Sequence, residues 1–124
     1  MKKTPTLLFL FTISIAIFSC RENNSNISIS YKETGHTYSM KADFPESRTR
    51  EVDEYMDDKI GSASNMSFTN TRIDGTLALD DHTTFYIKKA LGTLRVSFDK
   101  DKNSERSYLE IKSMCDGIKK VLAK

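Results

Sequence analysis

Apolar residues change their spacing several times along this chain, and these changes constrain the fold more than any single motif does. Between residues 27 and 44 apolar side chains occupy every second position, which is typical of strands with one buried face. Between residues 46 and 60 they recur every three or four positions, as on one side of an α-helix. Alternation returns between residues 66 and 98, and the helical spacing returns up to Leu122. Strands and helices therefore occupy separate parts of the chain.

The alternating segments predict six strands, and turn residues separate most of them. Gly35 lies in the first hairpin, Asp74-Gly75 is a strong two-residue turn signal, and Gly92 interrupts the last alternating run. The order ββα-ββββα indicates an α+β fold, with an antiparallel sheet of about six strands and two helices packed on one face. The expected strands contain Ile27–Tyr31, Tyr38–Phe44, Met66–Phe68, Leu77–Leu79, Phe85–Ile87 and Leu94–Phe98.

The first twenty residues form a segment of a different kind. Lys2 and Lys3 precede an apolar run over residues 7–18, and Ser19 then precedes Cys20. A basic start, an apolar run of this length and a small residue before the cut are typical of a secretory signal. The run is shorter than the roughly 20 apolar residues that span a bilayer.

At Ile17-Phe18-Ser19-Cys20 this segment resembles a bacterial lipoprotein signal. The resemblance covers residues 1–20 only, and Ile17 and Phe18 depart mildly from the usual residues. It implies that residues 1–19 are removed and that Cys20 is lipidated. Residues 20–26 are then a lipidated cysteine and a flexible tether, and residues 27–124 are a single domain. In such lipoproteins the residue after the cysteine helps to select the membrane, and Arg21 favours the outer membrane. The side of that membrane stays open.

Removal of this segment changes the charge balance. Without residues 1–19, Lys plus Arg falls from 19 to 17 and equals the 17 Asp plus Glu. A neutral domain gives no support to nucleic-acid binding. Cys115 is then the only cysteine besides the acylated Cys20, so we expect no disulfide, and its place on the apolar side of the last helix predicts a core residue.

The stretch from Asp99 to Glu110 has the ligand spacing of a calcium loop. Asp99, Asp101, Asn103 and Glu110 are the candidate metal ligands. Ser104 stands where such loops need Gly, and Lys100 and Lys102 reduce the local negative charge. The alternative interpretation is a strand end followed by a helix that Asn103 or Ser104 caps.

A second candidate group is Asp80-Asp81-His82, which is either a polar turn or part of a polar site. Counting strand directions places this turn, the turn with His36 and the Asp99 loop at the same end of the sheet. The sequence therefore predicts a rim cluster of His36, Asp80, Asp81 and His82 beside the Asp99 loop. This expectation depends on the number of strands.

The sheet face away from the helices is where we expect a partner to bind. Tyr86, Lys88 and Arg95 should point to this open face, either as an interaction surface or as cross-strand pairs. No catalytic constellation is visible. The first hypothesis is a non-enzymatic, lipid-anchored envelope module that binds an envelope protein or a small ligand. The alternative is a calcium-dependent module that uses the acidic rim. A hydrolase is a third, weaker hypothesis.

Overall fold

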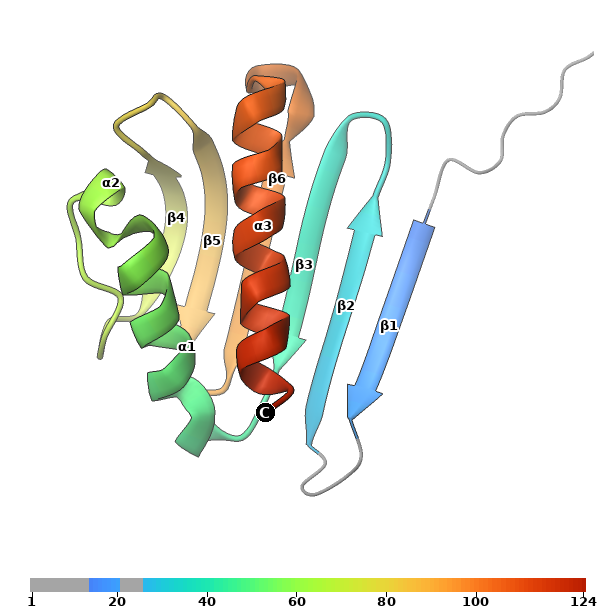
Figure 1. The fold of residues 1–124 in the computed structure, drawn as a ribbon, viewed down its shortest axis with the longest axis vertical. Helices are drawn as coiled ribbons and strands as arrows, with labels where there is room; N and C mark the ends of the chain where they lie inside the picture. The colour runs from blue at the N-terminus through green and yellow to red at the C-terminus, as the bar shows by residue number, and fades with distance from the viewer. Residues whose placement is uncertain (1–13, 21–25) are drawn as a thin grey trace, which may run out of the picture.

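A computed structural model of the protein describes residues 14–20, by their backbone, and residues 26–124 in full. All of its strands join one antiparallel sheet with the order β1-β2-β3-β6-β5-β4 (Figure 1). The central strands are β3 and β6, which pair in register from Thr37 opposite Asp99 to Asp43 opposite Thr93. The strands are β1 (Ser14–Cys20), β2 (Ile27–Glu33), β3 (Thr37–Asp43), β4 (Ile73–Ala78), β5 (Thr84–Ala90) and β6 (Thr93–Asp99).

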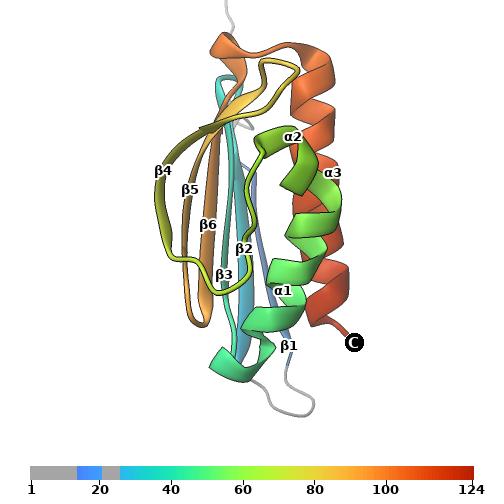
Figure 2. The ribbon, with the colours of Figure 1, turned by 90° about the vertical axis from the view of Figure 1, so that its left-hand side faces the viewer.

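Two helical segments cover one face of this sheet, and no helix of residues 14–20 or 26–124 lies on the other face (Figure 2). The first segment follows β3 and changes its winding along its length, and the second is the long C-terminal helix. The expected α+β fold with both helices on one face is therefore confirmed. The first segment contains η2 (Glu46–Arg48), α1 (Thr49–Met56), η3 (Asp57–Gly61) and α2 (Ser62–Ser64), and the second contains η4 (Lys100–Lys102) and α3 (Glu105–Leu122).

The core lies between the sheet and the helices, as the alternating pattern requires. The inward positions of β3 and β6 are fully apolar, because Tyr38, Met40 and Ala42 lie beside residues 94, 96 and 98. The apolar side of α3 lies on these strands, and Cys115 is buried among them as expected. Helix α3 contributes Ile111, Met114, Cys115, Ile118 and Leu122 to the core, and the first helical segment contributes Val52, Met56 and Ile60.

The expected number of strands is wrong by one within the domain. Residues 27–124 supply five strands to the sheet, and the sixth strand is β1, which pairs with β2 from Ser14 opposite Glu33 to Cys20 opposite Ile27. The expected strand at Met66–Phe68 is a loop. Phe68 is buried, but its amide donates to Oδ1 of Asp57 at 2.5 Å instead of to a neighbouring strand. A side chain replaces the strand pairing that this segment would otherwise need.

The turn expected at Asp74-Gly75 is also wrong, because both residues lie inside β4. Gly75 is opposite Ile87 of β5, so an edge strand carries this dipeptide without turning. The helical segment expected over residues 46–60 continues to Ser64, and Asn65 ends it with a left-handed φ of 59°. Asn tolerates this conformation, which makes it a good helix end.

The strand directions fix what meets at each end of the sheet. The β2–β3 turn, the β4–β5 turn and the end of β6 lie at one end, which is the upper end in Figure 1. The start of α3 follows β6 at the same end, and the β5–β6 hairpin lies at the other end. The predicted signal segment and tether fall mostly on residues 1–13 and 21–25, which lie outside the described residues.

Candidate functional site

The four candidate calcium ligands each face a different partner. Oδ1 of Asp99 accepts from the amide of Asp101, and Oδ2 of Asp101 lies 2.9 Å from Nδ1 of His36. The Asn103 side chain instead holds the start of β5, because it accepts from the Thr84 amide at 2.9 Å and donates to the Thr84 carbonyl at 3.1 Å. Glu110, one turn into α3, faces Thr83. This stretch therefore links the end of β6 to the β2–β3 turn and to the start of β5.

Helix α3 begins at a capping serine, in agreement with the alternative interpretation of this stretch. Oγ of Ser104 accepts from the Ser107 amide at 3.0 Å, and Glu105 lies in the first turn, where negative charge favours the helix dipole. Lys100 anchors the preceding turn. Its Nζ donates to Oε2 of Glu33 at 2.7 Å and to the Thr34 carbonyl at 2.8 Å.

The structure places His36, Asp80, Asp81 and His82 at the same end of the sheet as the Asp99 loop. It brings His36 to Asp101 and Asp81 to the start of β5, where Oδ1 of Asp81 accepts from the Thr83 amide at 3.1 Å. His82 adopts a left-handed φ of 73° in its turn. These contacts form two separate groups, one on the β2–β3 turn and one on the β4–β5 turn.

Asp81 and Glu110 form a coupled carboxyl pair in the second group. Hydrogen bonds from the Thr83 hydroxyl and amide lower the pKa of Asp81 and outweigh the smaller effect of desolvation on this exposed residue. Burial, the hydrogen bond to Asp81 and the Asp81 charge raise the pKa of Glu110. Glu110 is therefore the partner that keeps a proton more readily and donates it to Asp81. Beneath them the hydroxyls of Thr83 and Ser107 lie 2.6 Å apart and are buried.

Among the described residues, no three His, Cys, Asp or Glu side chains come together in a way that could hold a metal ion. The acidic groups at this end bind hydroxyls, amides and a histidine instead. Calcium binding at Asp99–Glu110 stays a prediction that no described ligand cluster supports.

The open face of the sheet carries a row of cations. Arg95 of β6 is opposite Lys41 of β3 on one side and opposite Lys88 of β5 on the other. All three side chains are exposed, and none forms an ion pair with an acidic side chain of the described residues. Directly opposed like charges destabilise a sheet by a few tenths to about 1 kcal/mol per pair. Asp74 of β4 lies opposite Lys88 and offsets part of this repulsion at one end of the row.

The row next to it supplies hydroxyl groups. Ser39, Ser97 and Tyr86 are successive cross-strand partners on β3, β6 and β5. The Tyr86 hydroxyl donates to Oδ1 of Asp74 at 2.6 Å, which fixes its ring on the face and raises its pKa. Lys41, Arg95 and these three hydroxyl-bearing residues help to line a groove of about 380 Å³ on the open face. Cations in a groove with polar walls are suited to binding an acidic ligand.

With this geometry described, comparison with protein-family models, with curated proteins and with solved structures gives no match for the chain. The site therefore has to be argued from its own residues. Within the part of the chain that the structure describes, no helix has the length and apolar character needed to cross a bilayer. Cys115 is fully buried, and burial raises the pKa of its thiol, so it lacks the properties of a reactive thiol.

The sequence interpretation found part of the open-face row and missed the rest. Alternation on β5 and β6 predicts Tyr86, Lys88 and Arg95 on this face, whereas Lys41 is not among the predicted residues. A signal for it was present, because Lys41 lies between the inward-facing Met40 and Ala42. The pairing of β3 with β6, which brings Lys41 to Arg95, has no such local signal.

Proposed function

We propose that the protein is a lipid-anchored envelope module, held by acylated Cys20, that binds an acidic segment of an envelope protein on the open face of its sheet. The observation that carries this proposal is the row of Lys41, Arg95 and Lys88 across three neighbouring strands. An acidic partner would neutralise a row of charges that forms no ion pair with the acidic side chains of residues 26–124. The protein has no enzymatic role in this proposal.

The position of Cys20 in the chain would keep the domain close to the membrane. Cys20 is separated from the first residue of the domain, Ile27, by six residues. A flexible tether of this length spans roughly 15 Å, so the domain would be held close to the membrane surface. Substitution Cys20→Ser should therefore move the protein from the membrane fraction to the soluble fraction.

The open face is tested with poly-L-glutamate as the acidic probe. Fluorescence anisotropy of a labelled oligomer should show saturable binding to the full chain, which weakens as salt is added because surface charges are screened. The variant Lys41→Ser/Lys88→Ser/Arg95→Ser should bind at least about tenfold more weakly. Its stability should not fall, since substitution removes opposed like charges.

The matched control removes three cations from the opposite side of the molecule. Lys59, Lys120 and Lys124 are exposed and line a groove beside α1 and α3. The variant with serine at these three positions has the same net charge as the open-face variant and should keep most of the binding. Equal losses in the two variants would show that binding follows net charge alone, and the proposal would then fail.

A further inference from the structure

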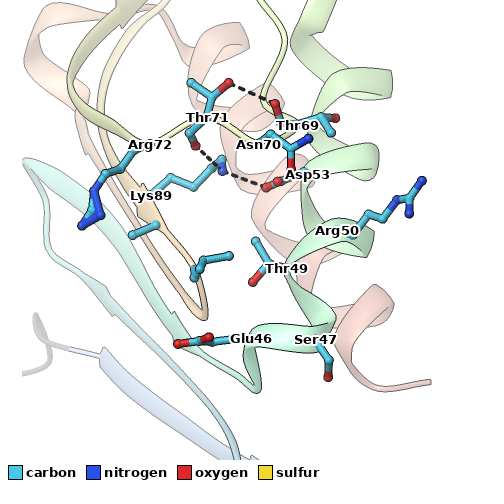
Figure 3. Close-up of a pocket in the computed structure, with 12 residues that line it drawn as sticks. Glu46, Ser47, Thr49, Arg50, Asp53, Thr69, Asn70, Thr71, Arg72 and Lys89 are labelled. Carbon is cyan, nitrogen blue, oxygen red and sulfur yellow. Dashed lines mark hydrogen bonds and ion pairs between the residues drawn. The ribbon is translucent and has the colours of Figure 1, made fainter.

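A second cavity lies away from the open face, on the helix side of the sheet near its lower end in Figure 1. It has a volume of about 530 Å³, within the range of small-molecule sites. The start of the first helical segment forms one wall, residues 69–72 form another, and the end of β5 forms the third (Figure 3). Leu91, which is exposed, stands at its edge.

Lys89 reaches into this site from a position that the strand pattern reserves for an apolar residue. It follows Phe85 and Ile87 on the inward side of β5, and its side chain is only 3% exposed. Its Nζ donates to the Thr71 carbonyl at 2.6 Å and lies 3.0 Å from Oδ1 of Asp53 on α1 (Figure 3). Removing a lysine and an aspartate from water costs several kcal/mol per ion in general.

Asp53 is not fully satisfied by this contact. Its side chain is 4% exposed, and the buried Oδ1 lies 3.0 Å from the Lys89 ammonium as an ion pair but accepts no hydrogen bond from the described residues. Buried polar atoms are nearly always hydrogen-bonded, so an unsatisfied carboxylate oxygen in the wall of a cavity needs an explanation. A donor supplied by a bound molecule would provide the missing hydrogen bond.

The surrounding groups define the chemistry of that molecule. The buried Thr49 hydroxyl accepts from the Gly92 amide at 2.9 Å, and its own proton has no acceptor among the described residues. A molecule bound in the cavity would therefore accept this proton and donate to Asp53. The charges of Asp53 and Lys89 offset each other, and the side chains of Arg50 and Arg72 point away from this pair (Figure 3). A neutral molecule whose groups both donate and accept matches this wall best.

We infer that this cavity binds a small neutral polyhydroxylated molecule of the sugar class, with one hydroxyl donating to Asp53 and another accepting from Thr49. Each sugar hydroxyl can donate and accept at once, so one molecule can serve both the Thr49 hydroxyl and the Asp53 carboxylate. This site is separate from the open face and does not depend on the proposed function.

The experiment uses the full chain in a detergent without sugar groups. D-Glucose, D-galactose and N-acetyl-D-glucosamine are the probes, and glycine and sodium phosphate are the zwitterionic and anionic comparisons. Saturation-transfer NMR should show binding of at least one sugar at about 10 mM, ten times a Kd of 1 mM. The same sugar should raise the melting temperature, because it binds only the folded chain.

The variant Asp53→Leu/Lys89→Met removes both charges and keeps the volume. Replacing a buried ion pair by apolar residues is often neutral or stabilising, whereas removing one partner leaves an uncompensated charge. The double variant should therefore fold and bind the sugar at least about tenfold more weakly. The matched control, Asp58→Leu/Lys59→Met, removes one acid and one base from exposed positions of the same helical segment and should bind as the parent does.

Three results would overturn the inference. In the first, no sugar binds the parent chain. In the second, a sugar binds the double variant and the parent equally well. In the third, glycine or phosphate binds in place of the sugars and is lost in the double variant, which would assign the cavity to a charged ligand. Failure of poly-L-glutamate to bind would leave this cavity unaffected, because Lys41, Lys88 and Arg95 do not line it.

Discussion

At the scale of single residues, the pair of Asp81 and Glu110 gives a pH-dependent prediction. The pKa of Glu110 is raised in the folded chain, so the folded state keeps a proton that the unfolded state has already released. Stability therefore falls as the pH rises from the ordinary value of a glutamate through the raised value. Above the raised pKa both carboxyl groups are ionised, and two negative charges face each other.

Glu110→Gln should remove this loss, because the amide can still donate to Asp81 without a charge. We expect the free energy of unfolding to rise by about 0.5 kcal/mol at pH 7, the scale of one like-charge pair, and to differ little from the parent near pH 4. Urea unfolding at both pH values measures this difference. Asp58→Asn, at an exposed position, is the control. A variant that is less stable than the parent at pH 7 would contradict the coupling.

Which residues could be predicted from the sequence depends on whether their partners are local. Ser104 was identifiable as a cap because its acceptor role needs only the next three residues. Lys89 was missed although alternation places it inward after Ile87, because its partner Asp53 is 36 positions away in the chain. Charge on a core-facing position is a signal that sequence alone can provide, whereas the identity of the partner requires the fold.

At the scale of elements, the contact between α1 and α3 depends on the absence of a side chain at Gly117. A Cβ built there would lie 1.7 Å from Oη of Tyr55, which projects from the first helical segment. Glycine costs about 1 kcal/mol relative to alanine inside a helix, and the close packing of the Tyr55 ring explains why the helix carries it.

Gly117→Ala should therefore destabilise the protein by about 1–2 kcal/mol, since overpacking outweighs the gain in helix propensity. In a Tyr55→Ala background the same substitution should instead stabilise it by about 0.5–1 kcal/mol, because only the propensity gain remains. Urea unfolding of the four chains in this cycle gives the coupling energy. Equal effects of the substitution in the two backgrounds would show that the ring moves aside without cost.

The errors at this scale have physical causes. Met66 and Phe68 alternate as in a strand, but two apolar residues do not supply a strand partner, and Asp57 binds this loop instead. Asp74-Gly75 is a turn signal only where the chain is free to turn, and here β5 holds it in register. The absent strand at Met66–Phe68 and the absent turn at Asp74-Gly75 each change the predicted chain direction once. The two errors therefore cancel. The expected end for the rim residues and the observed end therefore agree.

At the scale of the whole molecule, the two faces of the sheet have different roles. Apolar residues and both helical segments fill one face, while the other keeps cations and hydroxyls in contact with solvent. Period-two alternation predicts this division directly, since it sets which side chains share a face. The order of strands in the sheet is not encoded in such a pattern, and the pairing of β3 with β6 determines how the cations meet.

A shortened chain tests the assignment of residues 1–19 to a removable signal. The apolar core formed by residues 26–124 runs from Ile27 to Leu122. We expect a chain that begins at residue 20, with Cys20→Ser, to unfold in one cooperative urea transition. Removal of β1 leaves β2 as the sheet edge, so backbone amides of β2 that do not pair with β3 should exchange with deuterium much faster than those of β3 and β6. The central strands should keep protection close to the global free energy of unfolding. A chain without a cooperative transition would instead make β1 an essential strand, and residues 14–19 would then belong to the domain.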